Sequence, residues 1–187
     1  MKQDRQQAIE FLKGKTRSIS DFPSKGIIFR DLTTIFQDPG TMKMVVDLMG
    51  DLIFENKEKE INSKKLVGIE ARGFLLAGAL AGRYGGGVVL VRKPDKLPFY
   101  KKRIEYELEY GKDILEIHTD AIEQGEKVII VDDLLATGGT AKATCDLVET
   151  LGGIVEKLLF MVELPELSGR EKLKDHRVEA LYSFEGL

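Results

Sequence analysis

The sequence predicts an α/β fold in which a mainly parallel sheet is flanked by helices. Short apolar runs rich in β-branched residues recur along the chain, as expected for strands that are buried on both faces. Stretches with helical apolar spacing separate several of these runs, and this alternation is typical of parallel sheets, whose strands need crossover connections. With 187 residues, the chain fits one domain spanning 1–187 that can bury a substantial core.

The N-terminal segment, residues 1–39, does not follow this alternation. It begins with an amphipathic stretch in which Ile9 and Leu12 share a side, and it continues through a part interrupted by proline and glycine. We therefore expect a small cap over an edge of the sheet rather than another strand–helix unit.

The elements expected after residue 39 follow from apolar spacing. The stripe Met42–Ile53 and the segment Gly73–Arg83 predict two helices, and residues 141–151 predict a third that stops at Gly152-Gly153. The expected strands are Leu66–Ile69, Val88–Val91, Ile114–Ile117, Val128–Val131, Ile154–Val162 and Val178–Leu181.

The segment 93–110 is the least regular part of the chain. It contains Pro94 and Pro98 together with many basic and aromatic residues, and it has no strong helical period. One interpretation is a solvated hairpin whose charges keep a sheet edge soluble. The other is a functional loop, because a long charged insertion in a compact domain is usually functional or disordered.

Composition excludes several classes of protein. The hydrophobic content of 43% and the charged content of 32% are those of an ordinary globular domain, and a net charge of -3 provides no global basic field for nucleic acid. The single cysteine, Cys145, excludes an internal disulfide framework. The start lacks a secretory signal, and no apolar stretch reaches membrane-spanning length. We expect a cytoplasmic enzyme without a nucleic-acid or membrane partner.

The most informative segment is Val128–Thr140. Its apolar run ends in Asp132 and Asp133, and a small-residue turn, Thr137–Thr140, then leads into the expected helix. The free backbone N–H groups and the positive dipole end of a helix N-terminus attract phosphate, and glycines let an anion approach the backbone. The two carboxylates suit a neighbouring group that carries hydroxyls or positive charge. A ribose 5-phosphate combines these features in one ligand.

An ordinary strand–turn–helix is the alternative explanation of this segment, and two glycines alone would favour it. The segment is not a P-loop, because Gly-x-x-x-x-Gly-Lys-Ser/Thr does not occur, and the dinucleotide fingerprint Gly-x-Gly-x-x-Gly is missing after the strand. The combination of the turn with the carboxylate pair favours a phosphate-binding loop of another kind.

The segment also carries a family resemblance. Residues 128–140 resemble the phosphoribosyl-diphosphate loop of type I phosphoribosyltransferases, and Asp132–Thr140 is similar to the loop of their adenine-specific members. Three further motifs of these proteins occur in the expected order, at Asp21–Asp31, Gly68–Phe74 and Leu108–Lys112. The resemblance covers almost the whole chain.

The resemblance implies a type I phosphoribosyltransferase fold with an N-terminal hood at 1–39 and a mobile lid at 93–110 that closes over the substrates. It implies a homodimer and the transfer of the 5-phosphoribosyl group from phosphoribosyl diphosphate to adenine, which gives AMP and diphosphate. A 6-oxopurine phosphoribosyltransferase and a non-catalytic nucleotide-sensing regulator of the same fold are the alternatives.

The resemblance also assigns the sugar and diphosphate contacts. It places Asp132 and Asp133 beside the ribose 2- and 3-hydroxyls, where carboxylates accept hydrogen bonds and favour a developing cation. Arg72 would clamp the diphosphate, with Gly73 permitting close approach, and Lys93 would act in its own or in the neighbouring subunit's site. The cradle for the 5-phosphate comprises Ala136, Thr137, Gly138, Gly139 and Thr140.

The adenine contacts implied by the resemblance come mainly from the hood. The backbone of Ile28 would pair with the 6-amino group and N1, and the ring would lie between Phe29 and Leu134. Arg30 is placed near the base by the same motif.

Two lid residues complete the implied site. Glu109 is the candidate general acid–base group facing N7 of adenine, because a carboxyl group sequestered by the lid would have a raised pKa. Tyr110 would position the base or the sugar. Mg²⁺ is expected as cofactor, bound mainly through diphosphate and ribose oxygens rather than in a dedicated protein metal site.

Overall fold

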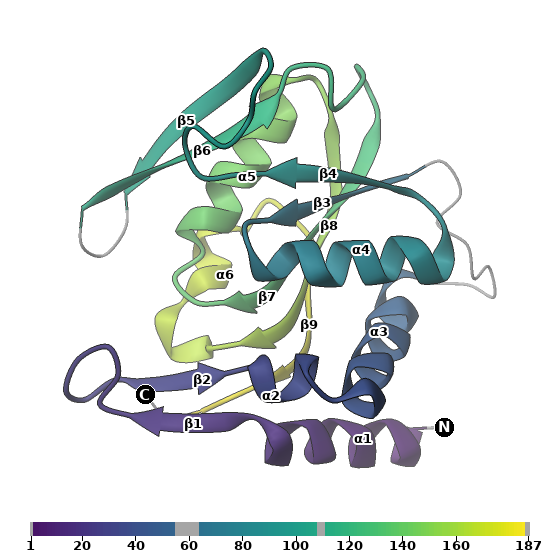
Figure 1. Cartoon of the computed structure of the whole chain (residues 1–187), viewed down its shortest axis with the longest axis vertical. Helices are drawn as coiled ribbons and strands as arrows, with labels where there is room; N and C mark the ends of the chain where they lie inside the picture. Colours follow the sequence, from purple (N-terminus) through teal and green to yellow (C-terminus); the bar gives the residue numbers. More distant parts are fainter. Residues whose placement is uncertain (1, 55–63, 108–110, 186–187) are drawn as a thin grey trace.

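A parallel sheet forms the centre of the molecule. The structure, a computed structural model, describes residues 2–54, 64–107 and 111–185. Within these residues the five strands of the sheet lie in the order β4 (Gly87–Val91), β3 (Lys65–Ile69), β7 (Lys127–Leu135), β8 (Ile154–Glu163) and β9 (Val178–Ser183) (Figure 1). Every neighbouring pair is parallel, which confirms the predicted fold class.

Helices and a hairpin cover the two faces of this sheet (Figure 1). One face carries α1 (Lys2–Lys15), α2 (Thr33–Phe36), α3 (Pro39–Ile53) and α4 (Arg72–Tyr84). The other carries α5 (Gly139–Thr150), α6 (Gly169–Lys172) and an antiparallel hairpin of β5 (Lys101–Glu107) and β6 (Lys112–His118). The short η1 (Pro165–Leu167) follows β8 and leads to α6.

Strand β7 shows how the sequence builds both cores. Its side chains alternate between faces, so that Ile129 and Val131 join the cluster under α3 and α4. Val128 and Ile130 join the cluster under α5 and the hairpin. A β-branched run buried on both faces is therefore the central strand, as the sequence predicts.

The three helices predicted after residue 39 are confirmed as α3, α4 and α5. The end of α5 is a Schellman motif, in which Gly152 has φ +84° and Gly153 N–H donates to the carbonyl of Val148 at 3.0 Å. The predicted stop at the glycine pair is thereby explained. In the part of the chain that is described, no helix combines the length and the apolar character needed to cross a membrane.

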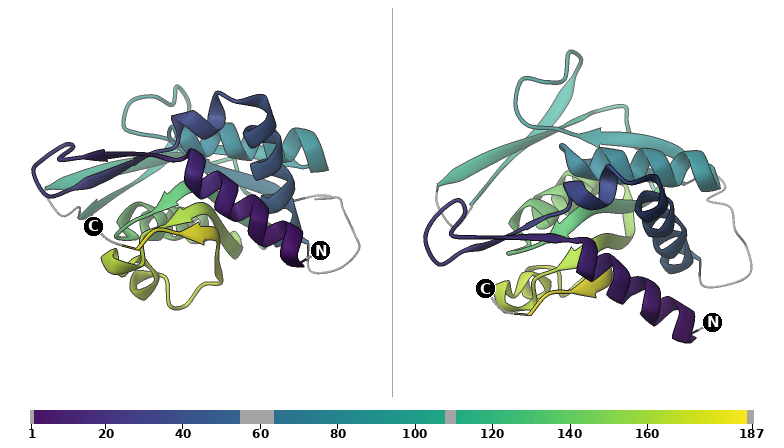
Figure 2. Two further views of the ribbon diagram at one scale, coloured as in Figure 1. Left: turned by 90° about the horizontal axis from the view of Figure 1, so that it is seen from below. Right: turned by 60° about the horizontal axis from the view of Figure 1, so that its bottom comes forward.

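The N-terminal segment forms a small cap that reaches the edge strand β9 (Figure 2). Helix α1 leads into an antiparallel pair, β1 (Arg17–Ser20) and β2 (Ile28–Asp31). Leu12 is fully buried in the core, and the Thr16 hydroxyl lies 3.3 Å from the hydroxyl of Tyr182 on the edge strand β9. The cap is therefore joined to the sheet by packing, and its function as a hood stays a prediction.

Two strand predictions need correction. Ile114–Ile117 does form a strand, but it belongs to the antiparallel hairpin and not to the parallel sheet. In addition, β7 does not end at Val131 but continues to Leu135, because the long strand β8 extends its ladder and pairs Phe160 with Asp132. Asp132 and Asp133 therefore lie within the strand and not in the turn that follows it.

The segment 93–110 is partly regular. Residues Lys101–Glu107 form β5, so the hairpin interpretation describes their backbone, whereas residues 108–110 lie outside the described residues. The basic residues of the segment neutralise a buried carboxylate on β6: Glu116 is fully buried and accepts hydrogen bonds from Arg103 at 2.6 Å and lies 2.9 Å from Lys101 Nζ. Motion of this segment as a lid stays a prediction.

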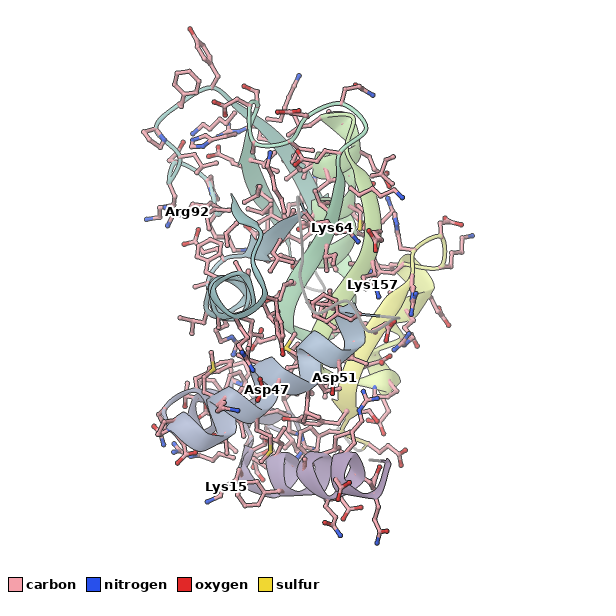
Figure 3. All side chains as sticks on the ribbon, turned by 90° about the vertical axis from the view of Figure 1, so that its right-hand side faces the viewer. Lys15, Asp47, Asp51, Lys64, Arg92 and Lys157 are labelled. Atoms are coloured by element: carbon pink, nitrogen blue, oxygen red, sulfur yellow. The ribbon has the colours of Figure 1, made fainter. Side chains whose placement is uncertain are left out.

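A buried lysine ties β8 to the end of α3 (Figure 3). Lys157 is 1% exposed, and its Nζ donates to the carbonyl oxygens of Leu52 at 2.9 Å and Ile53 at 3.4 Å. The last carbonyls of a helix have no partner within the helix, and they carry the negative end of its dipole. The buried ammonium group of Lys157 donates hydrogen bonds to these carbonyls and places a positive charge at the negative end of the dipole. It thereby fixes α3 against the sheet.

Candidate functional site

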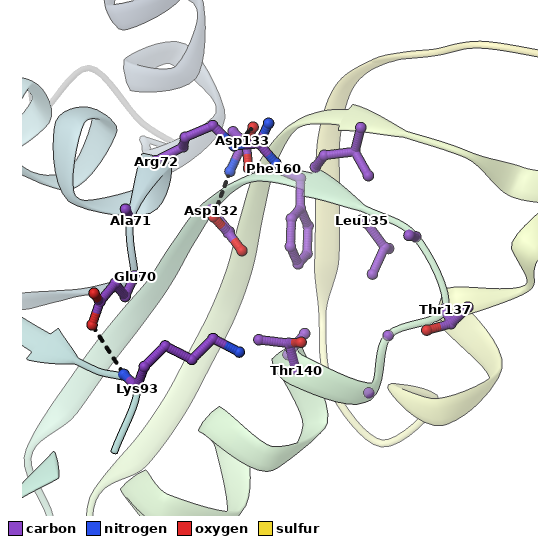
Figure 4. A pocket seen from close by; sticks show the side chains of 15 residues that line it. Glu70, Ala71, Arg72, Lys93, Asp132, Asp133, Leu135, Thr137, Thr140 and Phe160 are labelled. Atoms are coloured by element: carbon purple, nitrogen blue, oxygen red, sulfur yellow. Dashed lines mark hydrogen bonds and ion pairs between the residues drawn. The ribbon is translucent and has the colours of Figure 1, made fainter. Parts of the chain in front are cut away.

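The candidate site lies at the carboxyl ends of β3 and β7. These strands are parallel neighbours, so the segments that follow them meet at one edge of the sheet. A cavity of about 260 Å³ opens there (Figure 4). It is lined by Glu70, Ala71, Arg72, Lys93, Asp132–Ala141 and Phe160.

The turn before α5 presents a helix N-terminus to this cavity. Helix α5 begins at Gly139, and its N-cap residue Gly138 has φ +76° and provides no side-chain cap. The amide groups of the first turn are therefore left for an external partner, and the positive end of the helix dipole adds to their attraction for an anion. This is the arrangement predicted from the sequence.

Close backbone contacts fix the shape of that turn. A Cβ atom on Gly138 would lie 2.5 Å from the carbonyl oxygen of Gly169, at the start of α6. A Cβ atom on Gly169 would in turn lie 2.2 Å from the carbonyl oxygen of Ala136. Because both distances are too short for any side chain, glycine at both positions lets the two loops touch.

The carboxylate pair forms the second side of the cavity. Asp133 keeps only 3% of its side chain exposed, and its Oδ2 lies 2.8 Å from Arg72 Nε. Asp132 accepts a hydrogen bond from the backbone N–H of Asp133 at 2.9 Å. Burial raises the pKa of both carboxyl groups; the charge of Asp133 further raises the pKa of Asp132, whereas Arg72 opposes the rise for Asp133. A positive charge in the cavity would offset the electrostatic repulsion between the two carboxylates.

Glu70 fixes the third side of the cavity. Its carboxylate accepts hydrogen bonds from the backbone N–H of Lys93 at 3.0 Å and from Arg92 Nε at 3.1 Å. The side chain of Lys93 then extends along the cavity toward Thr140 (Figure 4). The structure thus holds two cationic side chains, Lys93 and Arg72, beside the anion-binding turn.

Most of the residues predicted to bind the sugar and the diphosphate line this cavity, and the other predicted site residues do not. Leu134 joins them in the lining, whereas Gly73 packs the start of α4 onto β7, where a Cβ atom would lie 2.7 Å from the carbonyl oxygen of Val131. The lid candidates Glu109 and Tyr110 lie outside the described residues. The predicted adenine residues on β2 do not line this cavity; they are Ile28, Phe29 and Arg30.

Strand β2 still ends close to the site. Hydrogen bonds from Thr33 lower the pKa of Asp31, the last residue of β2, and the charges of Arg17 and Arg72 contribute further. Arg72 therefore acts electrostatically on both Asp133 and the end of the cap.

Sequence reasoning missed several residues of the site. Glu70 stands in the motif Gly68–Phe74 but has no role there until its contacts to the segment after β4 are seen. Phe160 reaches the cavity only because its strand pairs with Asp132. Tyr106 and Asp113 face each other in the hairpin, and no sequence signal reveals them before the hairpin register is known.

Comparison with known proteins agrees with this geometry. Residues 31–162 match the family of the phosphoribosyl transferase domain. The fold, the anion-binding turn and this match define a phosphoribosyltransferase. Adenine phosphoribosyltransferases from Chlorobium limicola and Geotalea daltonii are each 49% identical to the chain, over 94% of it and 98% and 100% of their own lengths. The chain belongs to the adenine phosphoribosyltransferase family.

Solved structures support the same assignment. The adenine phosphoribosyltransferase of Thermoanaerobacter pseudethanolicus has a TM-score of 0.88 and 45% identity, over 94% of this chain and 99% of its own. The Saccharomyces cerevisiae enzyme, complexed with an imino-altritol bisphosphate and adenine, has a TM-score of 0.87 and 41% identity with the same coverage. The predicted family is therefore confirmed.

Proposed function

We propose that this enzyme transfers the 5-phosphoribosyl group from phosphoribosyl diphosphate to adenine, giving AMP and diphosphate in purine salvage. The observation that carries the proposal is the single cavity that brings a helix N-terminus, a carboxylate pair and two cationic side chains together. Family membership and the complex of the yeast relative with adenine support adenine as the acceptor.

The sugar phosphate would lie between the turn 136–140 and the carboxylate pair. Backbone amides of the turn, including the N–H of Thr140, and the hydroxyl of Thr137 would bind the 5-phosphate. The hydroxyl of Thr140 lies 3.1 Å from the hydroxyl of Tyr106. As the bond from ribose C1 to diphosphate breaks and the bond to adenine N9 forms, positive charge develops on the ring. Asp132 and Asp133 would stabilise that charge and accept hydrogen bonds from the ribose hydroxyls, which is electrostatic rather than covalent catalysis.

The diphosphate would leave toward Arg72 and Lys93. Both side chains line the cavity: Arg72 lies beside Asp133, and Lys93 extends toward Thr140 (Figure 4). Basic side chains of this kind bind phosphate oxygens. Gly73 would contribute by bringing the start of α4 close to β7. As the bond breaks, the sugar becomes cationic and the leaving diphosphate becomes more anionic. The site must therefore place negative charge beside the sugar and positive charge beside the diphosphate.

The base would bind between the cap and the cavity. Leu134 lines the cavity and supplies one apolar surface for the ring. Phe29 would supply the other, and in the structure it packs against Phe22 with ring centroids 5.2 Å apart. The backbone of Ile28 would pair with the Watson–Crick edge of adenine, and Arg30, stacked 4.4 Å over Phe184, would hold β2 near the base.

Mg²⁺ is proposed to enter with the diphosphate of the donor. Asp133 is engaged by Arg72, so Asp132 is the carboxylate of the pair best able to approach a cation in the cavity. Such a donor set fits a hard cation held mainly by substrate oxygens and water. When bound, the ion supplies neutralisation of the leaving diphosphate.

A homodimer in the cytoplasm is the proposed state of the enzyme. The apolar side chains exposed on α4 and on the edge strand β4 support an interface there, because such side chains otherwise face water. They include Leu75, Val88 and Leu90, which are 52%, 39% and 41% exposed.

The function is tested by offering four bases to the purified protein. Phosphoribosyl diphosphate and Mg²⁺ are supplied with adenine, hypoxanthine, guanine or xanthine, and diphosphate release is followed. We expect release with adenine and little with the others. Preference for any oxopurine would overturn the base assignment, and no release with any base would overturn the activity.

Glu109→Gln is expected to lower turnover by about 10²-fold or more while leaving adenine affinity nearly unchanged, because only proton transfer at the purine is removed. Steady-state kinetics and equilibrium binding of adenine separate the two effects. Glu123→Gln, at an exposed position after β6, is the matched control and should behave as the parent. Unchanged turnover in the Glu109 variant would remove this residue from the mechanism.

A further inference from the structure

Four side chains form a connected polar chain beside the cavity. They come from four segments: Lys93 follows β4, Tyr106 and Asp113 face each other across the β5–β6 hairpin, and Thr140 lies in the first turn of α5. Lys93 Nζ forms an ion pair with Asp113 Oδ2. The Tyr106 hydroxyl lies 3.2 Å from the same Oδ2 and 3.1 Å from the hydroxyl of Thr140.

The number of protons on each group decides which one donates in each of these hydrogen bonds. Burial alone would raise the pKa of Asp113, but hydrogen bonds from Lys93 and from the Ile114 N–H hold it below its usual value, so the group is an anion that only accepts. The single hydroxyl proton of Tyr106 is therefore donated to Asp113. Thr140 must then donate its own proton to Tyr106. One carboxylate thus engages both Lys93 and, through Tyr106, Thr140.

We propose that Asp113 is a positioning residue that competes with the phosphates of the donor for Lys93 and thereby sets the affinity for diphosphate. This inference rests on the proposed function, in which Lys93 and Thr140 bind opposite ends of phosphoribosyl diphosphate. Lys93 lines the cavity, yet its charge is engaged by a carboxylate of the hairpin. A phosphate oxygen that takes over Lys93 must displace that carboxylate.

Exposure shows that this ion pair is displaceable. The side chains of Lys93 and Asp113 keep 39% and 23% of their surface exposed. Partly exposed ion pairs contribute little, because water screens both charges. Glu116 on the same strand is the contrasting case, since it is fully buried between Lys101 and Arg103 and serves the hairpin itself. Asp113 is therefore held loosely enough to exchange partners with a ligand.

The test measures diphosphate binding to Asp113→Asn. The amide keeps the shape of the side chain and an oxygen that accepts from the Ile114 N–H, but it removes the charge that faces Lys93. We expect inorganic diphosphate with Mg²⁺ to bind about two- to fivefold more tightly in calorimetry, the range for a partly exposed ion pair. The KM for phosphoribosyl diphosphate should fall by the same factor, while the KM for adenine stays unchanged.

Two further variants show whether the effect passes through Lys93. Asp146→Asn removes an equal charge from a similar pair, Lys142–Asp146 on α5, whose side chains are 40% and 35% exposed, and it should leave diphosphate binding unchanged. In a Lys93→Gln background, Asp113→Asn should have no effect on diphosphate binding, because the partner of the competing carboxylate is gone.

The outcomes distinguish this inference from the proposed function. Unchanged or weaker diphosphate binding by Asp113→Asn would overturn the inference, since a carboxylate that merely orders Lys93 would give that result. The inference would also be overturned if Asp113→Asn tightened diphosphate binding by the same factor in the Lys93→Gln background. The binding measurement needs no transfer reaction, so failure of the adenine assay would be seen separately.

Discussion

Arg72→Leu is expected to lower the free energy of unfolding at neutral pH by about 2–4 kcal/mol, because it leaves Asp133 as a buried charge without its cation. The side chain of Asp133 is 3% exposed, and Arg72 Nε lies 2.8 Å from it. The expected loss is somewhat below the ~3–5 kcal/mol of a wholly buried pair, because the side chain of Arg72 keeps 41% of its surface exposed. Denaturant titration measures this loss.

The loss should shrink as the pH falls. Burial raises the pKa of Asp133 and Arg72 opposes that rise, so the Arg72→Leu variant has a higher folded-state pKa than the parent. A carboxyl group whose pKa is raised by folding favours the folded state below its unfolded pKa of about 3.9, and this advantage is lost as the pH rises through the folded pKa. The difference from the parent should therefore be larger at about pH 8 than at about pH 5.

Two comparisons isolate the buried charge as the cause. The double variant Arg72→Leu/Asp133→Asn should recover most of the lost stability, because the buried charge without a partner is gone. It should not recover transfer activity, because the guanidinium group and the carboxylate are both missing from the site. Arg83→Leu breaks an exposed pair with Asp47, 58% and 36% exposed, and should cost no more than about 1 kcal/mol. Equal losses at Arg72 and Arg83 would contradict the explanation.

The parts of the fold that could be predicted are those decided by local pattern and burial. Val128–Val131 is apolar on both faces, and the structure buries both faces in separate cores. The turn before α5 could be placed because glycine and a following helical pattern specify a helix start by themselves. Loop, helix and carboxylate pair are contiguous in sequence, so their proximity needed no tertiary information.

What could not be predicted depends on pairing between distant segments. The length of β7 is set by β8, since Phe160 pairs with Asp132. Lys93 and Asp113 meet only through the hairpin register, which apolar periodicity does not determine in a strand as charged as Lys101–Glu107. The basic character of that strand gave no hint that Glu116 would be buried beneath it.

The cap shows a different limit of sequence reasoning. The sequence indicates its amphipathic start but not the strands β1 and β2. The family resemblance names Ile28–Arg30 as base contacts, but the structure places these residues on β2, outside the lining of the cavity. Their position relative to the base depends on how the cap sits over the sheet edge, which is a matter of packing at Leu12 and Thr16. Their role as adenine contacts therefore stays a prediction.

Gly138→Ala is expected to reduce kcat/KM for phosphoribosyl diphosphate by about 10²-fold or more, because the turn that would bind the 5-phosphate must move. Gly138 has φ +76°, and a Cβ atom would lie 2.5 Å from the carbonyl oxygen of Gly169. The atoms that the new methyl group would meet belong to the backbone of Gly169 and not to a flexible side chain, so the backbone itself must move. The amides at the start of α5 would then no longer point at one phosphate position.

Gly125→Ala separates this displacement from backbone strain. Gly125 has φ +77°, nearly the same as Gly138, but a Cβ atom there meets nothing within 4 Å. Alanine in the left-handed region should cost each variant about 1–2 kcal/mol of unfolding free energy, and only Gly138→Ala should also lose transfer. If both variants lost activity equally, strain in the chain would explain the loss. If Gly138→Ala kept full activity, the turn at α5 would not be the phosphate site.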